Sequence, residues 1–127
     1  MERFLKYRFD HKNKLIIETY RGEIELEHFI EYEKEKTNDP EYNDSYSLFI
    51  DIRDAIFKYS DVEKKIFYKT ILDIASKINM NRKCAFLTTN PSEVASSILF
   101  KLRAMKFTSL KVEIFSTEVA ALSWLKQ

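Results

Sequence analysis

Three charged side chains offer the plainest chemistry in this sequence, because Asp51, Arg53 and Asp54 directly follow the short apolar run Leu48–Ile50. Two carboxylates close together can act as a general acid and a general base. In an extended segment, however, side chains two residues apart point to the same side, so Arg53 should form an ion pair with Asp51. We therefore predict a structural ion pair here, and a protein that is not an enzyme.

Hydroxyl side chains stand at two places where helices should begin. Ser60 precedes Glu63 by three residues, which is the capping-box spacing of a helix N-terminus. Thr88 and Ser92 flank an Asn-Pro pair, whose asparagine suits the N-cap and whose proline suits the first helical position. These hydroxyls could donate hydrogen bonds to a ligand at the strand ends, or they could serve only the loop and the caps.

Rare residue types exclude several classes of site. Gly22 is the only glycine, whereas the common phosphate-binding loops need about two or three. Cys84 is the only cysteine and lies in an apolar run, so we expect a buried thiol, no disulfide within the chain and no thiolate metal cluster. His11 and His28 are the only imidazoles, and neither lies near the charged strand end. We therefore predict no metal and no cofactor.

Hydropathy and charge predict the location of the protein and one class of partner that it should not bind. No run approaches the roughly eighteen apolar residues of a membrane span, and the first residues lack the apolar core of a signal peptide, so we expect a cytoplasmic protein with no integral membrane segment. The net charge of +1 hides an asymmetry, with glutamates crowding residues 23–35 and bases dominating residues 77–111. Because acids elsewhere balance those bases, we predict no binding of nucleic acid.

Apolar residues follow the strand period in some segments and the helix period in others. The predicted strands cover 3–10, 14–20, 45–55, 84–87 and 110–115, and the predicted helices cover 24–38, 60–78, 91–106 and 116–125. The short link between the first two strands makes them an antiparallel hairpin, and the later alternation of strands and helices implies parallel strands with right-handed crossovers. We expect one α/β domain over 1–127, with a five-stranded mixed sheet and four helices.

Apolar spacing also predicts which face of each helix meets the sheet. In the helix over 60–78 the stripe is Val62, Ile66, Phe67, Ile71, Ile74, Ala75 and Ile78, and Asn79–Asn81 should end the helix. In the helix over 91–106 the stripe is Val94, Ile98, Leu102 and Met105. Gly22 should end the second strand, and residues 55–59 should form a connector.

Four segments carry a resemblance to a known family. They are Gly22-Glu23 after the hairpin, Asp39-Pro40 after the acidic helix, Ile50-Asp51-Ile52-Arg53-Asp54-Ala55, and Phe115-Ser116 followed by Ala121-Leu122-Ser123-Trp124-Leu125. With them the chain resembles the SpoIIAA-like superfamily, which contains STAS domains, and more closely a group of small, mostly uncharacterised bacterial STAS/SEC14-like proteins. The resemblance spans nearly the whole chain and implies a SpoIIAA-like β/α superhelix whose neighbouring strands follow in near-consecutive order.

Two kinds of function are implied by the resemblance. Anti-sigma-factor antagonists of this fold are switched by phosphorylation of a serine at the start of the helix after the central strand, and Ser60 is the nearest counterpart. This chain has Tyr59-Ser60-Asp61-Val62 where those proteins have an Asp-Ser-(Ser/Thr)-Gly-like turn. CRAL-TRIO lipid-transfer domains have a similar topology, which implies a lipid or other small apolar ligand in a cleft at the strand ends; those domains are larger and build the pocket from extra helices.

We predict a non-enzymatic STAS-like module that acts through protein contacts, either with another protein or with itself as a homodimer. The expected surface is the connector from Asp54 to Ser60, because Ile56, Phe57 and Tyr59 are apolar and stand at a strand end. The alternatives are a small apolar ligand and a phosphorylation switch at Ser60. The candidate residues are Asp51, Arg53, Asp54, Phe57, Tyr59, Ser60, Thr88 and Ser92.

Overall fold

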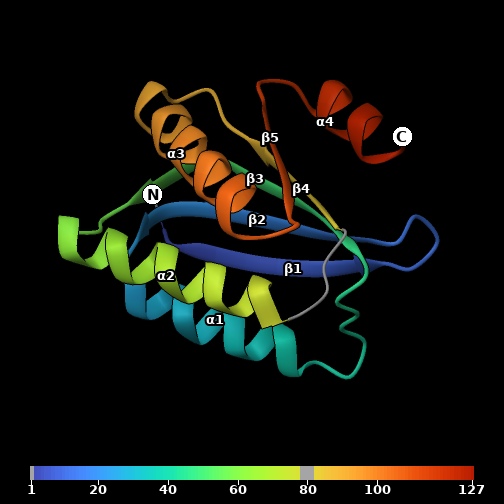
Figure 1. Cartoon of the computed structure of the whole chain (residues 1–127), viewed down its shortest axis with the longest axis horizontal. Helices are drawn as coiled ribbons and strands as arrows, with labels where there is room; N and C mark the ends of the chain where they lie inside the picture. The colour runs from blue at the N-terminus through green and yellow to red at the C-terminus, as the bar shows by residue number, and fades with distance from the viewer. Residues whose placement is uncertain (1, 78–81) are drawn as a thin grey trace.

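The computed structural model describes residues 2–77 and 82–127, with side chains described over 2–73 and 82–127. The elements follow one another as β1 (Phe4–Asp10), β2 (Leu15–Ile24), α1 (Leu26–Asn38), β3 (Ser47–Phe57), α2 (Asp61–Lys77), β4 (Lys83–Leu87), α3 (Pro91–Phe107), β5 (Lys111–Phe115) and α4 (Glu118–Leu125). The described strands form one five-stranded sheet in the order β1-β2-β3-β4-β5 (Figure 1). Strand β1 is antiparallel to β2, and the other neighbours are parallel, so the predicted mixed α/β sheet is confirmed.

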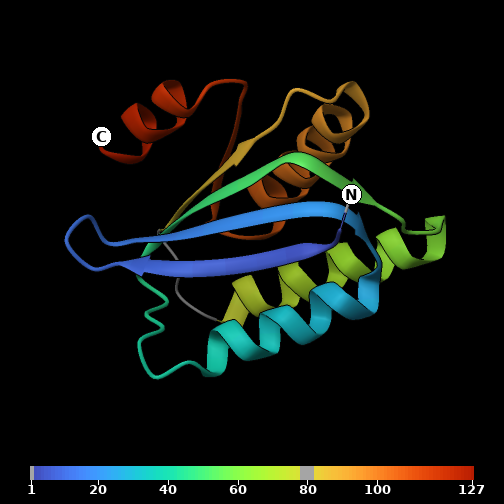
Figure 2. The ribbon, with the colours of Figure 1, turned by 180° about the vertical axis from the view of Figure 1, so that it is seen from behind.

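The helices are divided unequally between the two faces of the sheet. Helices α1, α2 and α3 lie on one face, and α4 lies on the other, beside β4 (Figures 1 and 2). The larger buried cluster joins β2, β3 and β4 to α1, α2 and α3, and the smaller one joins Phe49 and Leu87 to Ala121 and Leu125 of α4. On the face of the sheet opposite α1 and α2, no described helix covers β1 or most of β2 (Figure 2), whereas α4 packs near Leu15 of β2 and Phe49 of β3.

Two strands run further than predicted. Strand β2 continues through Gly22 to Ile24, so the expectation that this glycine ends the strand is wrong. Gly22 has φ 79°, which a residue with a side chain adopts only at a cost, and it follows a shift in the β2–β3 register between Thr19 and Arg21. Strand β3 pairs with this extension as far as Phe57, so part of the predicted connector is strand.

The starts of α2 and α3 are local features that the sequence predicted correctly, whereas α1 begins at Leu26 and not at the predicted Ile24, which belongs to β2. The Glu63 backbone N–H donates to Ser60 Oγ, and the Ser60 backbone N–H donates to a Glu63 carboxylate oxygen, both at 3.1 Å. At α3 the Ser92 backbone N–H donates to Asn90 Oδ1 at 3.0 Å. Helix α1 ends at Asn38, just before Asp39-Pro40, as expected.

The predicted apolar stripes are wrong in part. On α2, Val62 is 67% exposed and Ile66 is 47% exposed, while Tyr68 is buried. On α3 the residues facing the sheet are Glu93, Ser97, Phe100 and Ala104, whereas Ile98, Leu102 and Met105 are exposed. Both helices carry apolar residues all round, so spacing alone could not select the buried side. The predicted end of α2 at Asn79–Asn81, and the stripe positions Ile74, Ala75 and Ile78, lie outside the described side chains.

Candidate ligand cavity

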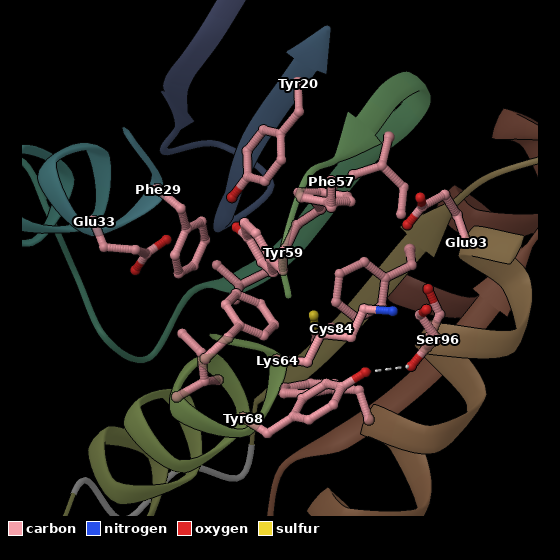
Figure 3. Close-up of a pocket in the computed structure, with 18 of the residues that line it drawn as sticks. Tyr20, Phe29, Glu33, Phe57, Tyr59, Lys64, Tyr68, Cys84, Glu93 and Ser96 are labelled. Carbon is pink, nitrogen blue, oxygen red and sulfur yellow. Dashed lines mark hydrogen bonds between the residues drawn. The ribbon is translucent and has the colours of Figure 1, made fainter. Parts of the chain in front are cut away.

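A cavity of about 370 Å³ lies between the sheet and the three helices on its larger face. Its middle is apolar and mostly aromatic, and polar side chains gather towards its ends. The side chains in Figure 3 converge on it from β2, β3, β4, α1, α2 and α3. The apolar lining residues are Tyr20, Phe29, Leu48, Ile50, Ile52, Phe57, Phe67, Tyr68, Ile71, Cys84, Phe86, Phe100 and Leu110.

Aromatic rings from separate elements contact one another around this space. Phe29 of α1 and Phe67 of α2 have ring centroids 4.8 Å apart in an edge-on arrangement. Tyr59 lies 5.4 Å from Phe67 and 5.6 Å from Phe57, which in turn lies 6.2 Å from Tyr20. Such ring pairs add stability beyond that gained from the apolar area they bury, so they stabilise the wall around the open space.

A group of buried charges closes the end of the cavity near the C-terminus of α1. Glu18 of β2 is fully buried, and one of its carboxylate oxygens accepts from the Tyr20 hydroxyl, the Tyr32 hydroxyl and Lys36 Nζ at 3.1, 2.7 and 3.1 Å. Lys36 Nζ also lies 2.6 Å from Glu33 Oε1. The second oxygen of Glu18 has no hydrogen-bond partner within the part of the chain that is described.

The electrostatics of this end follow from its burial. Burial by itself would lower the pKa of Lys36, but Glu18 and Glu33 more than offset it and raise that pKa above its ordinary value. Burial raises the pKa of Glu33, against the opposing effect of Lys36. Arg82 lies at the same end, where its Nε donates to the Tyr46 carbonyl oxygen at 2.7 Å.

The opposite end of the cavity lies where β3 ends and α2 and α3 begin. Glu93, only 8% exposed, lines it together with Ser92, Ser96 and Lys64. Burial raises the pKa of Glu93, although a hydrogen bond from the Phe57 backbone and the charge of Lys64 lower it.

Tyr59 also lines this cavity. Its hydroxyl is buried and, among the described residues, has no hydrogen-bond partner. Burial raises the pKa of this hydroxyl, so it stays protonated and can donate a hydrogen bond at neutral pH. The cavity therefore offers an unused donor beside its apolar wall.

The structure brings some of the predicted site residues together. Phe57, Tyr59 and Ser92 all line the cavity, although they come from a strand end, a loop and a helix start. Ser60 stands next to them in the chain, exposed, with its side chain engaged in capping α2. Tyr68 holds the neighbouring wall in place, because its hydroxyl donates to the Ser96 carbonyl oxygen at 3.3 Å (Figure 3).

Other predicted site residues lie elsewhere. Asp51 and Arg53 form the expected ion pair, with Arg53 Nη2 2.8 Å from Asp51 Oδ2. They stand inside β3 and on the face opposite to Ile50 and Ile52, so the expectation that they mark a strand end is wrong. Asp54 is exposed. Thr88 is buried after β4, with its backbone N–H bonded to the Phe115 carbonyl oxygen at 3.0 Å, and it does not line the cavity.

Most of the cavity lining was missed by reasoning from the sequence. Lys36 falls at the spacing of Phe29 and Tyr32 on the buried side of α1, and a lysine in an apolar stripe is a signal for a buried ion pair. The high aromatic content of the sequence was a second signal, because aromatic side chains from several elements line the cavity. Cys84 matches its prediction, since it is 2% exposed and burial raises the pKa of its thiol to about 12.

A protein of known structure has a similar fold. It is an uncharacterised protein from the DUF3478 family with a SpoIIAA-like fold, from Shewanella loihica PV-4, and the superposition has a TM-score of 0.62 over 97% of this chain and 93% of that chain. The fold is SpoIIAA-like. The SpoIIAA-like superhelix implied by the resemblance is thereby confirmed, and at 13% identity the likeness shows the fold alone. No family model matches the sequence, and no curated protein matches it.

A helix that crosses a bilayer needs about 20 mostly apolar residues. Over the described residues, no helix of this SpoIIAA-like fold combines that length with that apolar character.

Proposed function

We propose that this protein binds a small apolar or amphipathic molecule in the cavity between the sheet and helices α1, α2 and α3. The observation that supports this most directly is an aromatic-walled space of about 370 Å³ into which Tyr59 brings a hydroxyl without a partner among the described residues. Small-molecule sites typically enclose about 300–1,000 Å³ with mostly apolar walls and a few polar groups. A buried hydroxyl without a partner costs about 1–3 kcal/mol, and a ligand oxygen that accepts from it would remove that cost.

The composition of the wall supports one kind of ligand over others. Its apolar middle suits an alkyl chain or a ring system, and its polar ends suit one hydrogen-bonding group. The Tyr59 hydroxyl and Lys64 can donate to such a group, whereas the Lys36 charge is already shared by Glu18 and Glu33. A neutral head group that accepts a hydrogen bond therefore fits the Tyr59 end, because Lys64 opposes a cationic group and Glu93 opposes an acidic one.

We propose binding rather than catalysis as the role of the site. The Cys84 thiol is buried and has a pKa of about 12, so it is not a reactive thiolate at neutral pH. Asp51 is paired with Arg53 on the other face of the sheet. Neither residue offers an activated group to a molecule in the cavity.

The first test is native mass spectrometry of freshly purified full-length protein, before and after denaturation. We expect extra mass on the native protein that disappears on denaturation. A native protein with no added mass, combined with no effect of the probe described next, would overturn the proposal.

Two tryptophan variants of α2 make the test specific. Ile71 lines the cavity, whereas Ile66 is 47% exposed on the same helix and does not line it. Ile71→Trp should fill the space, and Ile66→Trp is the matched control. With decanol as the probe, we expect the wild type and Ile66→Trp to gain thermal stability, and Ile71→Trp to bind at least about tenfold more weakly. Equal binding by the two variants would place the probe outside the cavity and contradict the proposal.

A second candidate function is contact with a protein partner or a second copy through the connector that we predicted. It is favoured by Ile56, which is 48% exposed between the exposed residues Asp54 and Lys58. Phe57 and Tyr59 line the cavity, so changing them would disturb both functions. Ile56→Asp separates the two, because it should abolish a homodimer seen by light scattering and leave probe binding unchanged. An unchanged mass in solution would count against this second function.

A further inference from the structure

Helix α3 is apolar on the side that faces away from the sheet. Ile98, Leu99, Leu102 and Met105 are 44%, 53%, 55% and 64% exposed. Ile98, Leu102 and Met105 are spaced four and three residues apart, so they stand on one side of the helix, with Leu99 one turn before Leu102. We call these four residues the outer stripe of α3. Single exposed apolar residues are common, but a contiguous group on one helix indicates a surface that meets something.

The orientation of α3 on the sheet leaves these aliphatic residues exposed although smaller and polar residues are buried. The side that faces the sheet carries Glu93 and Ser97, both buried, while larger aliphatic residues are left outside. Turning the helix to bury Leu102 would expose Phe100 and Ala104 instead, so the helix is apolar on two sides. The sheet and the cavity account for one of those sides, and within the described structure nothing covers the other.

Basic residues border the outer stripe on both sides. Lys101 lies on the β5 side, where its Nζ contacts both carboxylate oxygens of Glu113 at 2.9 Å. Arg103 lies on the α2 side, where its guanidinium is 4.5 Å from the centre of the Tyr68 ring. Lys106 follows in the last turn and is exposed.

The neighbouring helix extends this basic border. Lys65 and Lys69 of α2 meet Arg103 and Phe107 in a groove between α2 and α3, which also contains Asp73. On α3 itself the only acid is Glu93, and it is buried at the cavity end. The surface around the stripe is therefore positive, in keeping with the excess of bases over residues 77–111.

We propose that the outer stripe of α3 docks on an anionic membrane surface, with the helix lying in the plane of the interface. Aliphatic side chains bordered by lysine and arginine have the pattern of interfacial helices, whose apolar face enters the boundary between head groups and acyl chains while the bases meet anionic lipid. This inference goes beyond ligand binding in the cavity and does not depend on it. Because α3 also supplies Ser96 and Phe100 to the cavity, docking would bring one cavity wall to the membrane.

A second copy of this chain fits the stripe less well. A stable interface buries about 800 Å² on each partner from some 20–30 residues, whereas the outer stripe has four half-exposed side chains on one helix. A two-fold contact of α3 with α3 would also bring the bases of one copy against those of the other. A membrane surface with anionic lipid avoids both difficulties.

The test uses the full chain and vesicles of two compositions, phosphatidylcholine alone and phosphatidylcholine with about 30% phosphatidylserine. In a flotation assay we expect at least tenfold more protein on the anionic vesicles, and less as salt is raised. The double variant Leu102→Gln and Met105→Gln should lower the bound fraction at least fivefold. Val119→Gln is the matched control, because Val119 is 81% exposed on α4 across the sheet. Equal loss in the two variants, or equal binding to both vesicle types, would overturn the proposal.

A spectroscopic measurement gives an independent readout. Trp124 is the only tryptophan and lies on α4, so the wild-type emission should not shift when vesicles are added. Leu102→Trp adds a reporter on the outer stripe, and its emission should move to shorter wavelength with anionic vesicles. No shift, or a shift of Trp124 alone, would refute docking through α3. Loss of a homodimer in the double variant, with no vesicle binding by the wild type, would assign the stripe to a second copy instead.

Discussion

Replacing Lys36 by methionine tests the buried charge group most severely. The ammonium of Lys36 lies 3.1 Å from Glu18 and 2.6 Å from Glu33, with side chains that are 5%, 0% and 19% exposed. Removing the lysine leaves the fully buried Glu18 without its positive partner and, among the described side chains, with hydrogen bonds from the Tyr20 and Tyr32 hydroxyls alone. Breaking a buried pair in this way typically costs about 3–5 kcal/mol. For a chain of 127 residues that corresponds to a fall in Tm of about 10–20 °C.

The assay is urea unfolding followed by circular dichroism, with two comparison variants. Lys58→Met removes an exposed pair, since Lys58 Nζ is 3.8 Å from Glu23 with side chains 54% and 68% exposed, and it should change the free energy of unfolding by less than about 0.5 kcal/mol. The double variant Glu18→Gln and Lys36→Met removes both charges. Its loss of unfolding free energy should therefore be about 1.5–3 kcal/mol smaller than the sum of the losses in the two single variants. If Lys36→Met behaved like Lys58→Met, or if the single effects simply added, the reasoning would be wrong.

Alkaline titration checks the same ion pair, because deprotonating Lys36 removes the same positive charge as the methionine substitution. The carboxylates raise the pKa of Lys36 in the folded protein above its ordinary value of 10.5. A cation whose folded pKa is raised contributes its full stability below the unfolded pKa and loses it as pH rises through the folded one. The gap in stability between the wild type and Lys36→Met should therefore stay constant up to about pH 10 and narrow above it. A gap that widened with rising pH would contradict the assignment.

Three further changes test other parts of the structure. Ser60→Ala should cost about 1 kcal/mol of unfolding free energy through the lost cap, and intact mass of protein from its own host would show whether Ser60 carries phosphate. Asp51→Asn should lower the unfolding free energy by no more than about 1 kcal/mol, because Arg53 is 41% exposed. Burial raises the pKa of Asp51, but Arg53 more than offsets this effect and lowers that pKa. The loss of stability should therefore be present at neutral pH and vanish as pH falls through the lowered pKa. Burial raises the pKa of Glu93, so the wild type should lose stability relative to Glu93→Gln as pH rises from about 4 to 7, as measured by urea midpoints. A difference in stability that did not change with pH would mean that the Glu93 carboxyl is solvated.

The order of strands and helices could be predicted because its signals are local. The Ser60–Glu63 capping box and the Asn90 cap act within one helical turn, so a short window of sequence contains them. The ion pair of Asp51 with Arg53 is local for the same reason, since alternation along an extended segment places the two side chains on one side. These expectations are confirmed.

The buried faces of α2 and α3 could not be predicted in the same way. Both helices have apolar residues on more than one side, so the spacing of Ile98, Leu102 and Met105 fitted a buried stripe as well as an exposed one. The choice between Phe100 and Leu102 depends on which side the sheet and the cavity occupy. That is a property of the packed chain, not of the helix.

The amino-acid sequence by itself determined the order of strands and helices, the hairpin, the caps of α2 and α3, and the burial of Cys84. Each of these depends on neighbouring residues along the chain or on the hydrophobic pattern. The tertiary structure alone decided that Glu18 meets Lys36, that Phe57, Tyr59 and Ser92 share a cavity, and that α3 turns four aliphatic residues outward. Those contacts join residues from different elements, and long-range packing selects them from many arrangements that the same local pattern would allow.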